Sequence, residues 1–80
     1  MAIKRIDSPL PGVLYLSPAP GAPAFKAPGD NVAVGDTLAL IEVMKSYIPI
    51  EAEEAGIFKG YLTESDTVLE PGEPLCELET

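Results

Sequence analysis

The residues whose chemistry stands out lie near the middle of the chain, at Met44-Lys45-Ser46. An apolar run, 38–43, precedes them, and a second β-prone run, 47–50, follows them. Two short β-prone runs with a short break predict a β-hairpin, although the usual Asn-Gly or Asp-Gly turn signal is missing. A hairpin tip would hold the Lys45 amine out in water. Lys45 is therefore the residue at which we expect the chemistry.

Two interpretations of this lysine stay open. An exposed amine is mostly protonated at neutral pH, which makes it a poor nucleophile or base, but it is a good target for enzymatic acylation, which removes its charge. A recognition surface for a modifying enzyme would explain the apolar Met44 beside it. The alternative is a solvated lysine without a function, which is the ordinary state of a lysine on a turn.

The composition excludes several kinds of site. The chain of 80 residues has no histidine and one cysteine, Cys76. A Ser-His or Cys-His nucleophile pair is therefore excluded, and a thiolate or imidazole metal site is not expected. Cys76 has no partner for an internal disulfide, and we expect it in the core.

The net charge and the hydropathy limit the kinds of partner that the chain can have. The net charge of −8 argues against nucleic acid and against anionic membrane surfaces, and it favours protein partners. No run is long enough to span a bilayer, and no secretory signal pattern is present. We therefore expect a cytoplasmic protein.

Turn signals divide the chain into short β-prone runs, and no stretch shows a helical period. Many short strands separated by Pro and Gly predict an all-β barrel or sandwich. Residues 17–23 hold three prolines in seven positions, which predicts a stiff loop. Residues 24–26 could rejoin the sheet. The expected strands are 2–7, 13–16, 37–43, 46–52, 57–62 and 75–79, with shorter pieces at 32–34 and 67–69.

An internal repeat relates the two halves of the chain. Residues 35–42 match 72–79 at an offset of 37 positions, and Gly12-Val13-Leu14 resembles Gly56-Ile57-Phe58. The first half is longer by seven residues, the length of the loop 17–23. We expect two similar β halves that form one barrel, with the hairpin between them near a quasi-twofold axis.

The two-residue period of a strand predicts which face is buried. Ala39 and Ile41 should share a core face with Cys76 and Leu78, whereas the glutamates that follow, 42 and 79, should point outward.

With these features in place, the chain resembles the biotinyl/lipoyl carrier domains. That family shares a flattened β-barrel of two four-stranded antiparallel sheets with quasi-twofold symmetry, and its acceptor lysine lies on a tight hairpin. The signature of the biotinyl branch is Glu-Ala-Met-Lys-Met, and here the sequence is Glu42-Val43-Met44-Lys45-Ser46. Lipoyl domains usually carry Asp-Lys, so Met44 favours biotin. The resemblance covers about residues 8–79, including the segments 8–12, 35–38, 50–52 and 72–75.

The loop 17–23 is similar to the thumb of the biotin carboxyl carrier subunits of bacterial acetyl-CoA carboxylase, which folds toward the biotin. The resemblance implies that thumb residues contact biotin here, namely Pro18, Ala19, Pro20 and Gly21. It also implies one biotinyl domain over residues 1–80, either excised from a longer subunit or free-standing.

The function implied by the resemblance is that of a non-catalytic carrier. Biotin would be amide-linked to Lys45 by a biotin protein ligase that recognises Val43, Met44 and Ser46. A biotin carboxylase subunit would load the carboxyl group, and a carboxyltransferase subunit would pass it to an acyl-CoA such as acetyl-CoA in fatty acid biosynthesis.

Two positions depart from the family pattern. Val43 replaces the usual alanine and Ser46 an apolar residue, which implies slower biotinylation or a dedicated ligase. The competing interpretations are a lipoyl carrier of a dehydrogenase complex and an unmodified module for protein interaction with Lys45 free.

Overall fold

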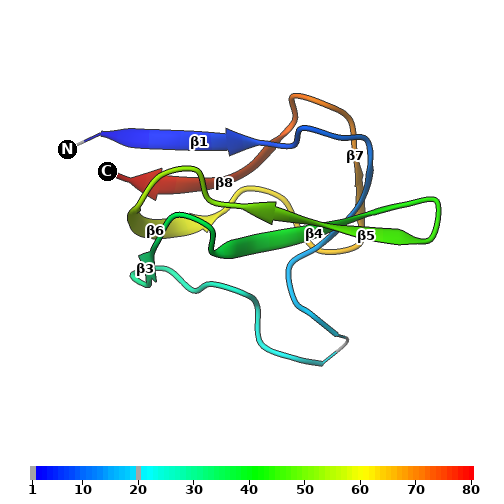
Figure 1. Cartoon of the computed structure of the whole chain (residues 1–80), viewed down its shortest axis with the longest axis horizontal. Coiled ribbons are helices and arrows are strands. Elements are labelled where there is room, and N and C mark those ends of the chain that lie inside the picture. Colours follow the sequence, from blue (N-terminus) through cyan, green and yellow to red (C-terminus); the bar gives the residue numbers. More distant parts are fainter. Residues whose placement is uncertain (1, 20) are drawn as a thin grey trace.

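The computed structural model describes residues 2–19 and 21–80, and its regular structure in that part of the chain is entirely β (Figure 1). The described residues form no helix, so none is long and apolar enough to cross a membrane. The strands are β1 (Ile3–Asp7), β2 (Gly12–Tyr15), β3 (Asn31–Val32), β4 (Thr37–Val43), β5 (Ser46–Glu51), β6 (Gly56–Tyr61), β7 (Thr67–Leu69) and β8 (Pro74–Glu79).

Two four-stranded sheets pack face to face, in the strand orders β1-β8-β6-β3 and β5-β4-β2-β7. Every neighbouring pair is antiparallel. The predicted fold class, with its two four-stranded sheets, is therefore confirmed. Residues 24–26 do not rejoin either sheet, because the amides of Phe25 and Lys26 donate to the Leu16 carbonyl and the Tyr61 hydroxyl instead. Strand β3 is limited to two residues.

The internal repeat corresponds to a quasi-twofold arrangement of strands. Replacing β1, β8, β6 and β3 by β5, β4, β2 and β7 converts one sheet order into the other. The irregularities match as well. The β4–β5 register shifts between Thr37 and Ala39, which leaves Leu38 as an extra residue. The β1–β8 register skips Leu75, the repeat counterpart of Leu38.

These bulges enlarge the core. Ala39, Ile41, Cys76 and Leu78 are fully buried, as the alternation predicts. Strict alternation would turn Leu38 and Leu75 to the outer face, yet both are also fully buried, because an extra residue in a bulge resets the alternation of side chains. The buried cluster comprises Leu14, Val32, Leu38, Ala39, Ile41, Ile50, Ala52, Phe58, Leu69, Leu75, Cys76 and Leu78.

Two repeat-related glycines allow the central strands to approach closely. A Cβ atom built on Gly12 would lie 2.5 Å from the Glu42 carbonyl oxygen, and one built on Gly56 would lie 2.5 Å from the Glu79 carbonyl oxygen. No side chain fits at that separation. The contact at Glu42 lies directly below the predicted lysine hairpin, so it helps to position that hairpin.

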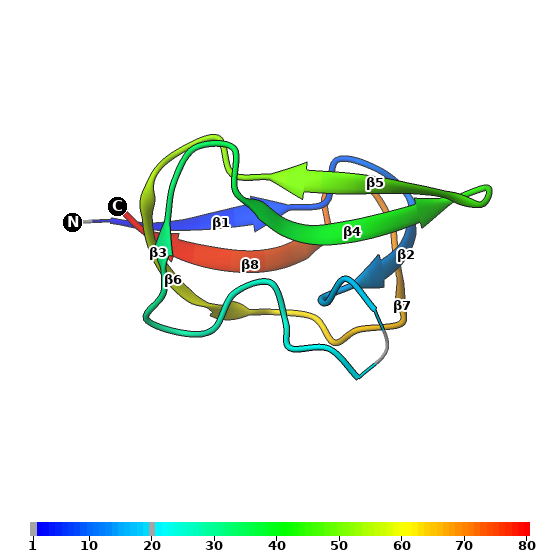
Figure 2. The same ribbon diagram turned by 60° about the horizontal axis from the view of Figure 1, so that its bottom comes forward.

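The β4–β5 hairpin extends beyond the rest of the barrel, and the start of β1 and the end of β8 lie at the opposite end (Figures 1 and 2). The loop after β2 also leaves the barrel on the hairpin side in both views. The fold thus places the lysine hairpin and the thumb loop away from the ends of the chain.

Candidate functional site

The predicted lysine hairpin is confirmed, and its turn is tight. Val43 pairs with Ser46 across the β4–β5 ladder, which leaves Met44 and Lys45 as a two-residue turn. Their φ angles are 49° and 69°, and positive φ at both central positions defines a type I′ turn. This turn type follows the right-handed twist of the strands, but it normally uses Asn-Gly. Each ordinary L-residue in such a conformation costs on the order of 1 kcal/mol, which the β4–β5 ladder must offset.

The acceptor Lys45 and the three predicted ligase-recognition residues, Val43, Met44 and Ser46, differ in exposure. Met44 is 92% exposed, so its apolar side chain contributes almost nothing to the core. Lys45 and Ser46 are exposed too, whereas Val43 is half-buried and packs against the core cluster. Val43 therefore has a structural role, and Met44 is presented to the solvent without one.

Lys45 is also distinguished by its electrostatics. The chain holds five lysine and arginine residues, and four of them form ion pairs: Lys4 with Glu54, Arg5 with Asp7, Lys26 with Asp36 and Lys59 with Glu79. Within the described part of the chain, Lys45 is the basic residue without a carboxylate partner. Neutralising its amine would therefore break no ion pair among those residues.

Hydrogen bonds among its described residues close the thumb loop, residues 17–23. Its neck is a hydrogen bond in which the Phe25 amide donates to the Leu16 carbonyl at 2.8 Å. Inside it, the Ala22 amide and the Ser17 hydroxyl both donate to the Ala19 carbonyl, at 3.1 Å each. Pro20, one of the four predicted biotin contacts, lies outside the described residues.

A cleft of about 760 Å³ separates the thumb from the outer face of the β4–β5 sheet. The predicted thumb contacts Pro18, Ala19 and Gly21 line one side of it, and Tyr47 lies on its wall only two positions after Lys45 in the chain. Its volume is in the range of ligand-sized pockets. The full lining is Tyr15, Ser17, Pro18, Ala19, Gly21, Leu40, Tyr47, Ser65 and Asp66.

Two tyrosines line the cleft and contact each other. The Tyr15 and Tyr47 rings lie 5.9 Å apart, tilted by 51°. The Tyr15 hydroxyl donates to the Glu42 carboxylate at 3.0 Å. That hydrogen bond, together with partial burial, raises the pKa of Tyr15 above its ordinary value. Tyr15 lies on β2 and Tyr47 on β5, and the two rings meet because both strands flank β4 in the sheet. A local sequence pattern does not contain that strand order.

Comparison with known proteins identifies a matching family model and similar sequences. A family model described as biotin-requiring enzyme matches residues 4–78. The biotin carboxyl carrier protein of acetyl-CoA carboxylase from Haemophilus influenzae is 42% identical over 92% of this chain and 48% of its own length. Its counterpart from Streptococcus pyogenes is 38% identical over 91% of this chain and 44% of its own length. The chain thus spans about half the length of these curated relatives.

A solved structure shares the fold. It is a single-chain, multi-domain long-chain acyl-CoA carboxylase, which superposes with a TM-score of 0.76 at 20% identity and covers 94% of this chain and 7% of that chain. At this level of identity the likeness concerns the fold alone.

Proposed function

The chain belongs to the family of biotin-requiring enzymes, and on that premise we propose that it carries biotin on Lys45 as the biotinyl domain of an acetyl-CoA carboxylase. It is a non-catalytic carrier in this proposal. The assignment depends on Lys45, which is exposed and lies at the centre of a type I′ turn. Among the described residues it forms no ion pair.

The residues around Lys45 fit the attachment of biotin. The lysine amine is accessible for acylation, and the loss of its charge costs no ion pair with the described residues. Biotin amide-linked at this position supplies a ureido nitrogen that carries the carboxyl group. The chain presents the attached group to its partners. The β4–β5 ladder holds the attachment point away from the barrel, and the thumb cleft has apolar walls at Pro18, Ala19 and Leu40.

The proposed partners follow from this role. A biotin protein ligase modifies Lys45 and recognises Val43, Met44 and Ser46, a biotin carboxylase subunit loads the carboxyl group, and a carboxyltransferase subunit removes it. The relatives' names support acetyl-CoA carboxylase as the host enzyme. We propose on this basis a role in fatty acid biosynthesis, and we propose a cytoplasmic location as a separate expectation. The net charge of −8 would speed encounter with basic partner surfaces at low ionic strength.

The test is intact mass after co-expression with a biotin ligase in medium that contains biotin. We expect one biotinyl adduct on the parent chain and none on the variant Lys45→Arg, which keeps the charge but cannot form the amide. The control Lys59→Arg changes a paired lysine elsewhere and should keep the adduct. A lipoyl adduct would contradict the biotin assignment, and an unmodified chain would favour an interaction module.

A further inference from the structure

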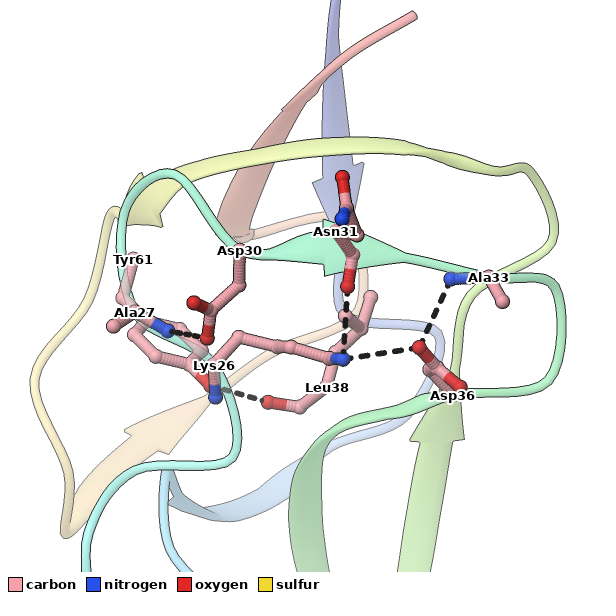
Figure 3. A network of polar contacts seen from close by, with 8 residues as sticks. All are labelled: Lys26, Ala27, Asp30, Asn31, Ala33, Asp36, Leu38 and Tyr61. Atoms are coloured by element: carbon pink, nitrogen blue, oxygen red, sulfur yellow. Dashed lines mark hydrogen bonds and ion pairs between the residues drawn. The ribbon is translucent and has the colours of Figure 1, made fainter.

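The Tyr61 hydroxyl lies where three segments of the chain meet. It donates to the Leu38 carbonyl at 2.7 Å and accepts from the Lys26 amide at 3.3 Å (Figure 3). Leu38 belongs to β4, the strand that leads to the lysine hairpin, and Lys26 follows the neck residue Phe25 of the thumb. One hydroxyl therefore links the base of the thumb to the strand that carries the attachment site.

The Lys26 side chain adds a second attachment to the same region. Its ammonium group donates to the Asp36 carboxylate at 3.0 Å and to the Asn31 carbonyl at 3.1 Å. The Asp36 carboxylate also accepts from the Ala33 amide at 2.9 Å, and these two hydrogen bonds lower the pKa of Asp36. The Lys26 side chain is only 18% exposed. Its backbone and its side chain are thus both held, just beyond the thumb.

Comparison of the two repeat halves shows that the Tyr61 hydroxyl takes the place of a backbone hydrogen bond. In the second half, the carbonyl of Leu75, the counterpart of Leu38, accepts a backbone hydrogen bond from the Leu62 amide at 2.8 Å. In the first half, the chain leaves the sheet after β2 and enters the thumb. The carbonyl of Leu38 is instead satisfied by a side chain, at the point where the inserted thumb interrupts the repeat.

We propose that Tyr61 is a positioning residue: its hydroxyl fastens the base of the thumb to β4, and thereby keeps the thumb in place over the cleft beside the lysine hairpin. The importance of this contact for a carrier rests on the proposed function, but the contact itself does not. Burial raises the pKa of Tyr61 to about 12, so the hydroxyl stays protonated and able to donate at all pH values at which the protein would be assayed.

The variant Tyr61→Phe removes only the hydroxyl. The ring can keep its edge-on contact with Phe58, whose centroid lies 4.7 Å away. The matched control is Thr63→Val, which removes another hydroxyl that donates to a backbone carbonyl at 2.7 Å, that of Pro74, without touching the thumb. Both variants lose one hydrogen bond from a hydroxyl to a backbone carbonyl, and Tyr61→Phe also loses the hydrogen bond that the Lys26 amide donates. A difference between them therefore reports on the thumb.

The readout is amide hydrogen exchange measured by NMR on the unmodified chain and referred to the slowest core amides. We expect exchange at Phe25 and Lys26 to accelerate by about tenfold in Tyr61→Phe, which corresponds to one lost hydrogen bond, and to stay unchanged in Thr63→Val. Unchanged protection at both amides in Tyr61→Phe would overturn the proposal. So would an equal acceleration in the two variants.

A second readout tests the consequence for the carrier. The chain is biotinylated, and amide chemical shifts of Ala19 and Gly21 are compared with and without biotin in the parent and in Tyr61→Phe. We expect biotin-dependent shifts in the parent that shrink at least twofold in the variant. Equal shifts would refute the positioning role. A parent chain that takes up no biotin would refute the proposed function, whereas the exchange experiment would still decide on the Tyr61 contact.

Discussion

The lysine turn is predicted to be built at the expense of stability. Met44 and Lys45 both adopt positive φ angles, 49° and 69°, in a turn that normally uses Asn-Gly. Replacing them together by Asn-Gly (Met44→Asn with Lys45→Gly) should remove the strain at the glycine and reduce it at the asparagine, an L-residue that tolerates the left-handed region. We therefore expect the double variant to be more stable than the parent chain.

The magnitude follows from two opposing terms. Relief of the left-handed conformation contributes roughly 1–2 kcal/mol at the new glycine and roughly half as much at the asparagine, whereas the glycine adds unfolded-state entropy that costs about 0.4–1 kcal/mol. Met44 is 92% exposed, so its removal loses almost no burial. The net gain is about 1–2 kcal/mol, and for a domain of this size each kcal/mol raises Tm by roughly 4–8 °C.

The assay is urea unfolding, with equal m-values required so that the midpoints report stability. Met44→Ala is the matched control, because it removes the methionine but leaves a left-handed L-residue, and its midpoint should match that of the parent. A double variant no more stable than Met44→Ala would refute the idea that the turn stores strain. If the idea holds, Lys45 is kept in the turn against stability, as expected for a residue retained for chemistry.

Three further predictions follow. Gly12→Ala and Gly56→Ala should each lower the free energy of unfolding by about 1–3 kcal/mol because the added methyl meets a carbonyl oxygen; urea midpoints within error of the parent would contradict the close approach. Burial raises the pKa of Cys76 from 9.0 to about 11. Between these pH values the folded chain binds more protons than the unfolded chain, so the free energy of unfolding falls as pH rises. Cys76→Ala should reduce that fall, and an identical pH dependence in the parent and the variant would argue against the buried thiol as its cause. Ser46→Met should speed biotinylation by a general biotin ligase, followed as a mass time course, and equal rates would show that Ser46 does not limit recognition.

Much of this protein was predictable from local patterns. The two-residue period placed Ala39, Ile41, Cys76 and Leu78 in the core, and each is fully buried. The β-prone runs around Lys45 predicted the hairpin, and the predicted strand 37–43 has the bounds that β4 shows. The repeat also predicted the quasi-twofold pairing of the sheets. The core face and the hairpin depend on neighbours in the sequence, whose alternation is directly visible, and the repeat is visible as a match between segments 37 positions apart.

Other features depend on contacts between distant segments, and only the tertiary structure decided them. The sequence did not predict the type I′ turn, because Met44 and Lys45 have no local preference for positive φ. The twist and register of the long β4–β5 ladder hold them in that conformation. The bulges at Leu38 and Leu75 bury residues that strict alternation would expose. Residues 24–26 stay outside both sheets because hydrogen bonds at the neck and base of the thumb satisfy Phe25 and Lys26 instead.

The cleft and the Tyr61 contact show most clearly the difference between features set by local sequence and features set by packing. The sequence by itself determined which lysine stands on a hairpin, because strand and turn patterns act over a few residues. It could not show that thumb residues face Tyr47, or that Tyr61 bonds a carbonyl 23 positions away and an amide 35 positions away. Those contacts exist only once the two halves pack, because packing alone brings separate strands and loops within hydrogen-bonding distance.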